Sequence, residues 1–191
     1  MESERLVAVY DACVLYPFHL RNLLVQCGVD GVIEPRWTDE IHAEWIRNLS
    51  VNRPTLSLSY LHAARDLMNA ALPTARVVGY EAIVPSVKLP DLNDRHVVAA
   101  PITGGASVIV TWNVRDFPAA ELRKHGLRKQ TPDAFLAQLF DQAPDVMVAV
   151  TGRARSNLRI SRVSPKEFLN ALRGQRLVQF VRRIAAHTAE L

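Results

Sequence analysis

Short apolar runs that end at acidic or polar residues alternate with stretches of helical spacing along the first part of the chain. Residues 6–10 form an apolar run directly before Asp11, and residues 107–111 form another directly before the polar segment 112–116. Such runs are typical of buried strands in a parallel sheet. Apolar residues recur at helical spacing in three stretches between these runs: residues 17–27, 39–49 and 57–72. The pattern predicts an α/β fold in which a parallel β-sheet is flanked by helices.

The pattern changes toward the C-terminus. Beyond Pro144 the spacing is helical throughout. Ser164 and Glu167 stand three residues apart ahead of an apolar stretch, which is typical of a helix capping box. We therefore predict two parts: an α/β domain over residues 1–135, and a small all-helical C-terminal region over residues 136–191.

The distribution of charge follows the same division. The 191 residues contain 23 Lys and Arg against 19 Asp and Glu, a formal net charge of +4. Residues 151–191 hold nine basic and two acidic residues, whereas the first 150 hold 14 and 17. A basic segment indicates contact with nucleic acid or with an acidic partner protein. It is equally typical of the solvated face of helices that pack on the rest of the protein. The candidate contact residues are Arg173, Arg176, Arg182 and Arg183.

Composition excludes several classes of protein. No apolar run approaches the ~20 residues that cross a membrane, and the acidic first residues do not resemble a signal peptide, so we expect a cytoplasmic protein without a membrane partner. Cys13 and Cys27 have neither zinc-site spacing nor neighbouring histidines. They are expected to be buried free thiols.

Five acidic residues lie near the ends of predicted elements or at the edge of a helix face. Asp11 and Asp116 follow strands, Asp94 opens a helix with Asp91 close by, and Glu44 lies at the edge of the apolar face of another helix. Ligand sites of open parallel sheets form outside the carboxyl ends of the strands. A cluster of carboxylates without His or Cys is the ligand set of Mg²⁺ or Mn²⁺. Each acid alone also has a simpler explanation, as a helix cap, a turn former or an exposed residue.

Four segments, in this order along the chain, resemble the PIN domain. They are VYDACVL (9–15), EIHAEW (40–45), LPDLNDRHVVAA (89–100) and VTWNVRDFP (110–118). Within that family the chain is similar to the larger VapC-type toxin ribonucleases, which carry an extra C-terminal helical region. The resemblance implies a Rossmann-like parallel sheet and an endoribonuclease that depends on Mg²⁺ or Mn²⁺. It also implies an RNA substrate, a cognate antitoxin protein and a homodimer.

The resemblance also assigns roles to individual residues. It implies that Asp11, Glu44, Asp94 and Asp116 are the catalytic, metal-holding acids, and that Asp91 is an additional metal-binding acid. Thr111 and Asn113 match polar residues that orient the last acid or a bound water. Pro101 departs from the alanine-rich helix of the family, and it is expected to limit or kink the helix that Asp94 opens.

Two other interpretations remain from the residues themselves. A haloacid dehalogenase-like phosphatase also places an Asp after its first strand, but it needs a second acid two positions later, where this chain has Cys13. A non-catalytic module that binds RNA or protein around a structural metal is the other alternative. Metal titration distinguishes it, because a structural ion stabilises the protein without supporting turnover.

Overall fold

A four-stranded parallel sheet forms the centre of the molecule. The computed structural model describes residues 5–191. The strands are β1 (Val7–Tyr10), β2 (Glu34–Arg36), β3 (Val108–Val110) and β4 (Arg128–Gln130). Their order is β2-β1-β3-β4, and each neighbouring pair is parallel. The chain leaves β1 toward one side to form β2 and later returns on the other side of β1 to form β3. These features confirm the predicted PIN-like α/β fold.

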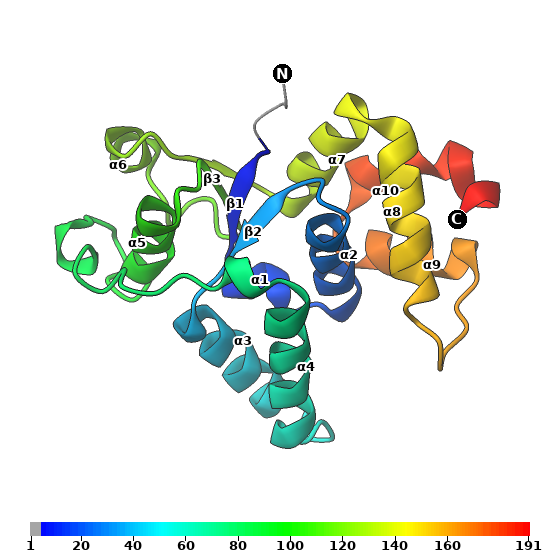
Figure 1. Cartoon of the computed structure of the whole chain (residues 1–191), viewed down its shortest axis with the longest axis horizontal. Coiled ribbons are helices and arrows are strands. Elements are labelled where there is room, and N and C mark those ends of the chain that lie inside the picture. The colour runs from blue at the N-terminus through cyan, green and yellow to red at the C-terminus, as the bar shows by residue number, and fades with distance from the viewer. Residues whose placement is uncertain (1–4) are drawn as a thin grey trace.

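Helices surround the sheet (Figure 1). Those of the first part are α1 (Ala12–Leu15), α2 (Phe18–Val29), α3 (Asp39–Asn52), α4 (Leu58–Ala71), α5 (Arg95–Gly104) and α6 (Ala119–Lys124). Three short 3₁₀ helices cover Pro73–Ala75, Val84–Ser86 and Ala185–Glu190. In Figure 1, α5 and α6 lie on one side of the sheet and α2 on the other, with α3 and α4 below. The carboxyl ends of the strands are therefore bordered by helices on both sides.

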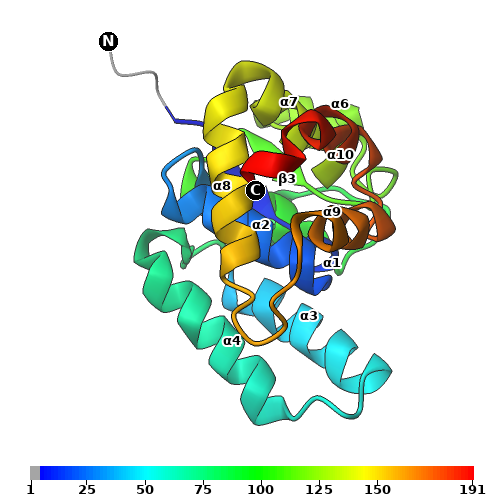
Figure 2. The same cartoon turned by 90° about the vertical axis from the view of Figure 1, so that its right-hand side faces the viewer.

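The C-terminal helices pack on α2. They are α7 (Pro132–Gln142), α8 (Pro144–Ser156), α9 (Pro165–Gly174) and α10 (Val178–Ile184). Figure 2 shows α8 lying over α2, and α7 contacts both α8 and α10. One buried apolar cluster contains Tyr10 and Leu24 as well as Phe135 and Phe180. The division between residues 135 and 136 stays a prediction; it falls inside α7.

Several helix starts follow the capping signals of the sequence. The side chain of Thr38 accepts a hydrogen bond from the backbone N–H of Ile41 at 3.1 Å, as expected of an N-cap. The capping box of Ser164 and Glu167 is complete, since each side chain accepts a hydrogen bond from the other residue's backbone N–H. These local signals place the start of α3 and the start of α9.

Two features differ from the sequence-based expectation. The edge strand β2 contains Pro35, and no strand was predicted at these residues. Its pairing with β1 creates the strand, because Pro is tolerated at a sheet edge. Pro101 does not limit α5, which continues to Gly104 and ends where Gly105 adopts a left-handed φ of 66°. The helix is buried from His96 to Pro101, and this packing outweighs the missing backbone donor.

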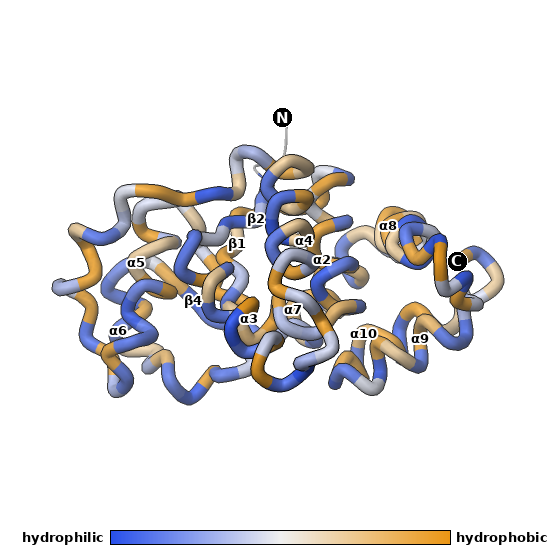
Figure 3. Tube along the Cα trace, turned by 90° about the horizontal axis from the view of Figure 1, so that it is seen from below, coloured by the Kyte–Doolittle hydropathy of each residue, from blue (hydrophilic) through white to orange (hydrophobic). Residues whose placement is uncertain are grey.

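Hydrophobic and hydrophilic residues alternate along the helices rather than forming long uniform stretches (Figure 3). Among residues 5–191, no helix combines the length and the apolar character that crossing a membrane requires. The apolar faces instead meet in the interior of the protein, as in the cluster that joins the sheet to the C-terminal helices.

Candidate active site

The candidate site begins where β1 and β3 end side by side. Asp11 follows β1 directly, and its backbone N–H donates to the carbonyl of Val110, the last residue of β3, at 3.1 Å. Thr111 follows β3. The strand order reverses between these two strands, which is where open α/β sheets bind ligands. The backbone thus brings Asp11 and Thr111 to the edge at which the sequence predicted a site.

The Asp11 carboxylate accepts two hydrogen bonds, both on the same oxygen atom. The Thr111 hydroxyl donates to its Oδ2 at 2.6 Å, and the Cys13 thiol donates to the same atom at 3.2 Å. Burial, with the Asp11 charge next, raises the pKa of Cys13 to about 12, so this thiol stays protonated and can donate. No residue described in the structure donates to Oδ1 of Asp11. That oxygen is free to bind a ligand.

Asp94 lies at the N-terminal end of α5 but does not cap the helix. Its side chain makes no capping hydrogen bond, contrary to the simpler explanation for an acid at this position. The pKa of Asp94 is raised from 3.8 to about 6, first by burial and then by the charges of Asp11, Asp91 and Asp116 in that order. The structure therefore brings these four carboxylates within electrostatic range of one another.

Glu44 joins the same cluster from α3. Its pKa is raised from 4.5 to about 7. Burial is the largest cause, and the charges of Asp11 and Asp94 come next. Glu44 and Asp94 thus both resist ionisation because of burial and neighbouring negative charge. Carboxylates with pKa values raised in this way are typical of functional sites.

The remaining predicted residues lie in two loops. Asp91 is exposed, and its Oδ1 accepts a hydrogen bond from the backbone N–H of Asn93 at 2.9 Å. Asn113 contributes its backbone N–H, which donates to the Thr111 hydroxyl at 2.9 Å, and its carbonyl accepts from the Asp116 N–H at 3.0 Å. The ammonium group of Lys129 on β4 donates to two carbonyls of the Asp116 loop, those of residues 114 and 117.

The donor chemistry of the cluster fits Mg²⁺ or Mn²⁺. Across residues 5–191, no three His, Cys, Asp or Glu side chains converge closely enough to enclose an ion together. Mg²⁺, however, keeps several waters and is usually bound through one or two carboxylates. Carboxylates that repel one another and leave an oxygen free suit such an open, water-rich site. The cluster therefore fits Mg²⁺ or Mn²⁺ because its donors are carboxylate oxygens that repel one another in the absence of a cation.

Sequence reasoning missed His96, which lies two residues after Asp94 on α5. It is buried, with Nε2 3.9 Å from Oε2 of Glu44 and Nδ1 3.8 Å from Oε2 of Glu40. Burial lowers the pKa of His96. The neutral ring therefore fills the space between α3 and α5 and borders Glu44. Its position beside Asp94 in the sequence was the one signal that could have identified it.

The four predicted arginines lie in different surroundings. The guanidinium of Arg176 lies over the ring of Trp112, 4.4 Å from its centroid. Nε of Arg183 instead donates to Asp141 on α7 at 2.8 Å. Arg173 and Arg182 are exposed. Of the four, Arg176 is the one that contacts a residue next to the acid cluster.

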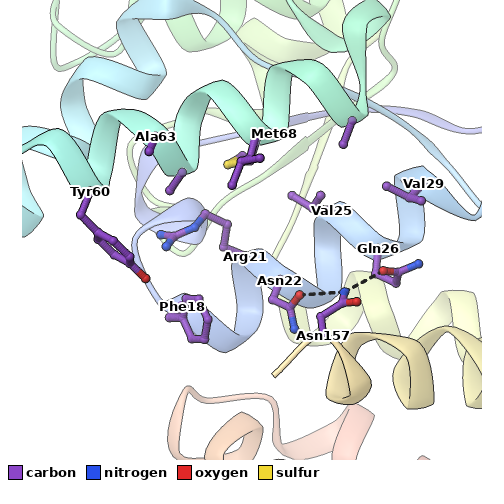
Figure 4. A pocket seen from close by; sticks show the side chains of 13 residues that line it. Phe18, Arg21, Asn22, Val25, Gln26, Val29, Tyr60, Ala63, Met68 and Asn157 are labelled. Atoms are coloured by element: carbon purple, nitrogen blue, oxygen red, sulfur yellow. Dashed lines mark hydrogen bonds between the residues drawn. The ribbon is translucent and has the colours of Figure 1, made fainter. Parts of the chain in front are cut away.

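A separate apolar groove of about 480 Å³ lies between α2 and α4 (Figure 4). Phe18, Tyr60 and Leu67 line it, and each is about half exposed or more. The Arg21 side chain, 7% exposed, also lines the groove, and its guanidinium lies 4.6 Å from the ring centroid of Trp45. Nη1 of Arg21 donates to the backbone carbonyls of Leu15 and Tyr16, but no carboxylate in the described part of the chain pairs with it.

The parallel sheet and the acid cluster at its carboxyl edge agree with the PIN-like α/β fold that the sequence predicted. Comparison with known proteins shows two similarities. The family described as VapC50 C-terminal domain matches residues 132–186, which lie over α7 to α10. One curated relative is "Putative ribonuclease VapC50" from Mycobacterium tuberculosis (strain ATCC 25618 / H37Rv). The two sequences are 31% identical over 109 residues, and this match covers 57% of this chain and 63% of the relative. Over the matched residues the chain is thus similar to a VapC-type protein and to the C-terminal domain of that type.

The matched segment spans somewhat less than two thirds of that relative's length. No solved structure matches the chain. The likeness to these proteins thus rests on sequence similarity, and the arrangement of the site comes from the structure described above.

Proposed function

We propose that this protein is a metal-dependent endoribonuclease and the toxin of a toxin–antitoxin pair. The observation that carries the proposal is the cluster of mutually repelling carboxylates at the switch point of the sheet, where Asp94 and Glu44 have raised pKa values. The relative's name, which describes a ribonuclease, supports RNA as the substrate. The reaction is hydrolysis of RNA phosphodiester bonds by an activated water.

The acidic residues would have different roles in binding the metal ion. Asp11, Asp94 and Asp116 would hold the ion, some of them through water, Glu44 would complete the shell partly through water, and exposed Asp91 would add charge nearby. Mg²⁺ or Mn²⁺, when bound, would lower the pKa of the attacking water and offset charge that develops on the phosphate. The Thr111 hydroxyl holds Oδ2 of Asp11, which would leave Oδ1 to bind the ion.

The surroundings of Cys13 favour hydrolysis by water over a covalent mechanism. Its thiol donates to Asp11 and, with a pKa near 12, is not available as a thiolate nucleophile. The phosphatase alternative requires an acid at this position to protonate the leaving group. A thiol that is already committed to Asp11 does not supply that proton, so we do not favour this alternative.

The test is cleavage of total RNA by the purified protein in Mg²⁺, Mn²⁺ or EDTA, with the new 5′ ends mapped. We expect metal-dependent cuts that disappear in Asp11→Asn and in Asp116→Asn while both variants stay folded. Asp66→Asn, on the exposed face of α4, is the matched control and should cut normally. Cleavage retained by both site variants would refute the assignment. Metal that raises the melting temperature without cleavage would favour the structural-metal alternative.

For the antitoxin we propose the groove between α2 and α4 as a docking surface. An apolar segment that carries a carboxylate fits it, because the groove exposes large apolar side chains and contains the Arg21 guanidinium without a carboxylate partner. A carboxylate from the partner would compensate that buried charge. The homodimer and the cytoplasmic location stay predictions.

A further inference from the structure

The turn between α9 and α10 places an arginine where the backbone favours glycine. Arg176 has a φ of 71°, in the left-handed region. Its N–H donates to the carbonyl of Arg173 at 3.0 Å, and the N–H of Leu177 donates to that of Leu172 at 3.2 Å. These two bonds define a Schellman motif, in which the left-handed position is usually Gly. A residue with a Cβ is disfavoured there.

The turn is fixed against the first part of the chain. Oε1 of Gln175 accepts a hydrogen bond from the backbone N–H of Leu20 at 2.9 Å, and Leu177 is fully buried. Both neighbours of Arg176 are thus anchored. The Arg176 side chain is exposed, and its guanidinium lies over the ring of Trp112. The anchored turn therefore fixes where this guanidinium lies.

Trp112 connects this guanidinium to the acid cluster. It follows Thr111, whose hydroxyl holds Asp11, and its backbone N–H donates to Sγ of Cys13 at 3.3 Å. No acidic side chain in the described part of the chain forms an ion pair with Arg176. An arginine that lies over an aromatic ring keeps the N–H groups at its edge available for a phosphate.

We propose that Arg176, stacked on Trp112, binds an RNA phosphate beside the bond that is cut and so positions the substrate. The inference rests on the proposed ribonuclease function and names one residue that the C-terminal region contributes to that site. An RNA strand that approaches five acidic side chains is repelled, and a cation held at their rim offsets that repulsion. A guanidinium suits this task because it can bind a phosphate through two parallel hydrogen bonds.

A role in docking the C-terminal helices alone does not account for arginine at this position. Gln175 and Leu177 already anchor the turn, and glycine would fit its backbone better. Arginine keeps a charge over the Trp112 ring in spite of the backbone preference. Unfavourable backbone conformations of this kind cluster at functional sites.

The decisive variant is Arg176→Gly, which removes the side chain and relieves the left-handed backbone. We expect KM for RNA cleavage to rise about tenfold, with kcat within about twofold, because one phosphate contact is lost. The slope of log affinity against log salt should fall by about one. The melting temperature should stay within a few degrees, since relief of the backbone offsets the lost stacking. Arg176→Lys keeps the charge and should recover part of the KM.

Arg162→Gly is the matched control. Arg162 is also an exposed arginine with a positive φ, 44°, but it lies in the connection between α8 and α9. Its variant should have wild-type KM. Equal KM values for Arg176→Gly and wild type, or equal increases in both glycine variants, would refute the inference. It would also fail if Arg176→Gly weakened antitoxin binding and left RNA binding unchanged.

The inference can fail separately from the proposed function. If the wild-type protein cuts no RNA in Mg²⁺ or Mn²⁺, the ribonuclease proposal is wrong. RNA affinity can still be measured by fluorescence anisotropy in an Asp116→Asn background, with and without Arg176→Gly. A loss of affinity there supports the phosphate contact, and unchanged affinity refutes it.

Discussion

The hydroxyl of Thr111 lies 2.6 Å from Oδ2 of Asp11, although 100 residues separate the two in sequence. Both side chains are buried, with Asp11 only 5% exposed. The Thr111 oxygen also accepts the backbone N–H of Asn113, so its own proton is directed to Asp11. The end of β3 thus sets the orientation of the acid that follows β1.

Removal of this hydroxyl should impair the site more than the fold. We expect Thr111→Val to lower RNA cleavage by 10- to 100-fold, roughly the usual cost of losing a residue that orients a metal ligand. The variant should lose only about 1 kcal/mol of unfolding free energy, because Cys13 still donates to Asp11. Cleavage assays and urea titrations measure the two effects. Thr55→Val, at an exposed position, is the control, and equal activity of both variants would contradict the role given to Thr111.

The acid cluster should cost stability when no metal is present. The pKa of Asp94 is raised from 3.8 to about 6, so its ionisation destabilises the folded state, and this penalty develops as the pH rises from about 4 to above 6. Asp94→Asn carries no such charge. In EDTA at pH 7.5 it should melt at a higher temperature than wild type, and it should gain less from added Mg²⁺. Asp66→Asn should show neither effect. A lower melting temperature for Asp94→Asn in EDTA would contradict the repulsion.

Glu121 should stabilise the fold in a pH-dependent way. Its carboxylate accepts hydrogen bonds from the Lys124 ammonium group and from the Lys88 backbone N–H, and these lower its pKa from 4.5 to about 2. A lowered pKa stabilises the folded state above pH 4.5, and the effect is lost as the pH falls toward 2. Glu121→Gln should therefore lower the melting temperature most at pH 7 and less at pH 3.5. Exposed Glu81→Gln is the control. A difference that does not change with pH would contradict this account.

The groove between α2 and α4 offers a test of the antitoxin surface. Leu67 on α4 is 72% exposed, so Leu67→Asp should fold normally. It places an acid where an apolar, carboxylate-bearing segment would bind, and we expect antitoxin affinity to fall at least tenfold with RNA cleavage unchanged. Calorimetry with the purified antitoxin measures the affinity. Val51→Asp is 73% exposed on α3, outside the groove, and should bind normally. A change in oligomeric state without loss of antitoxin binding would instead assign the groove to a second copy of the chain.

Local signals in the sequence were sufficient for much of the fold. The apolar runs that became β1 and β3 and the caps at Thr38 and Ser164 depend on neighbouring residues alone. The edge strand β2 was not predictable in this way, because its Pro35 and charged neighbours become a strand through hydrogen bonds to β1. The continuation of α5 through Pro101 likewise depends on burial, which a local pattern does not reveal.

In the candidate site, too, local sequence signals identified some features, and tertiary packing determined others. The acids could be selected from the sequence because each stands at the end or edge of an element, and the structure brings Asp11, Glu44 and Asp94 within electrostatic range. The contact between Trp112 and Arg176 could not be selected, since it exists only after the C-terminal helices dock. The catalytic roles of the acids stay predictions, which the variants described above test.

The long sequence separations within the site impose an order on its assembly during protein synthesis. Asp11 cannot receive the hydrogen bond of Thr111 until that residue has left the ribosome, and Arg176 follows 65 residues later. At about 5–20 residues per second this interval lasts roughly 3–13 s. For the proposed toxin, a newly made chain thus carries its acids for several seconds before its phosphate-binding arginine is in place. During that interval a waiting antitoxin can capture it before it binds RNA efficiently.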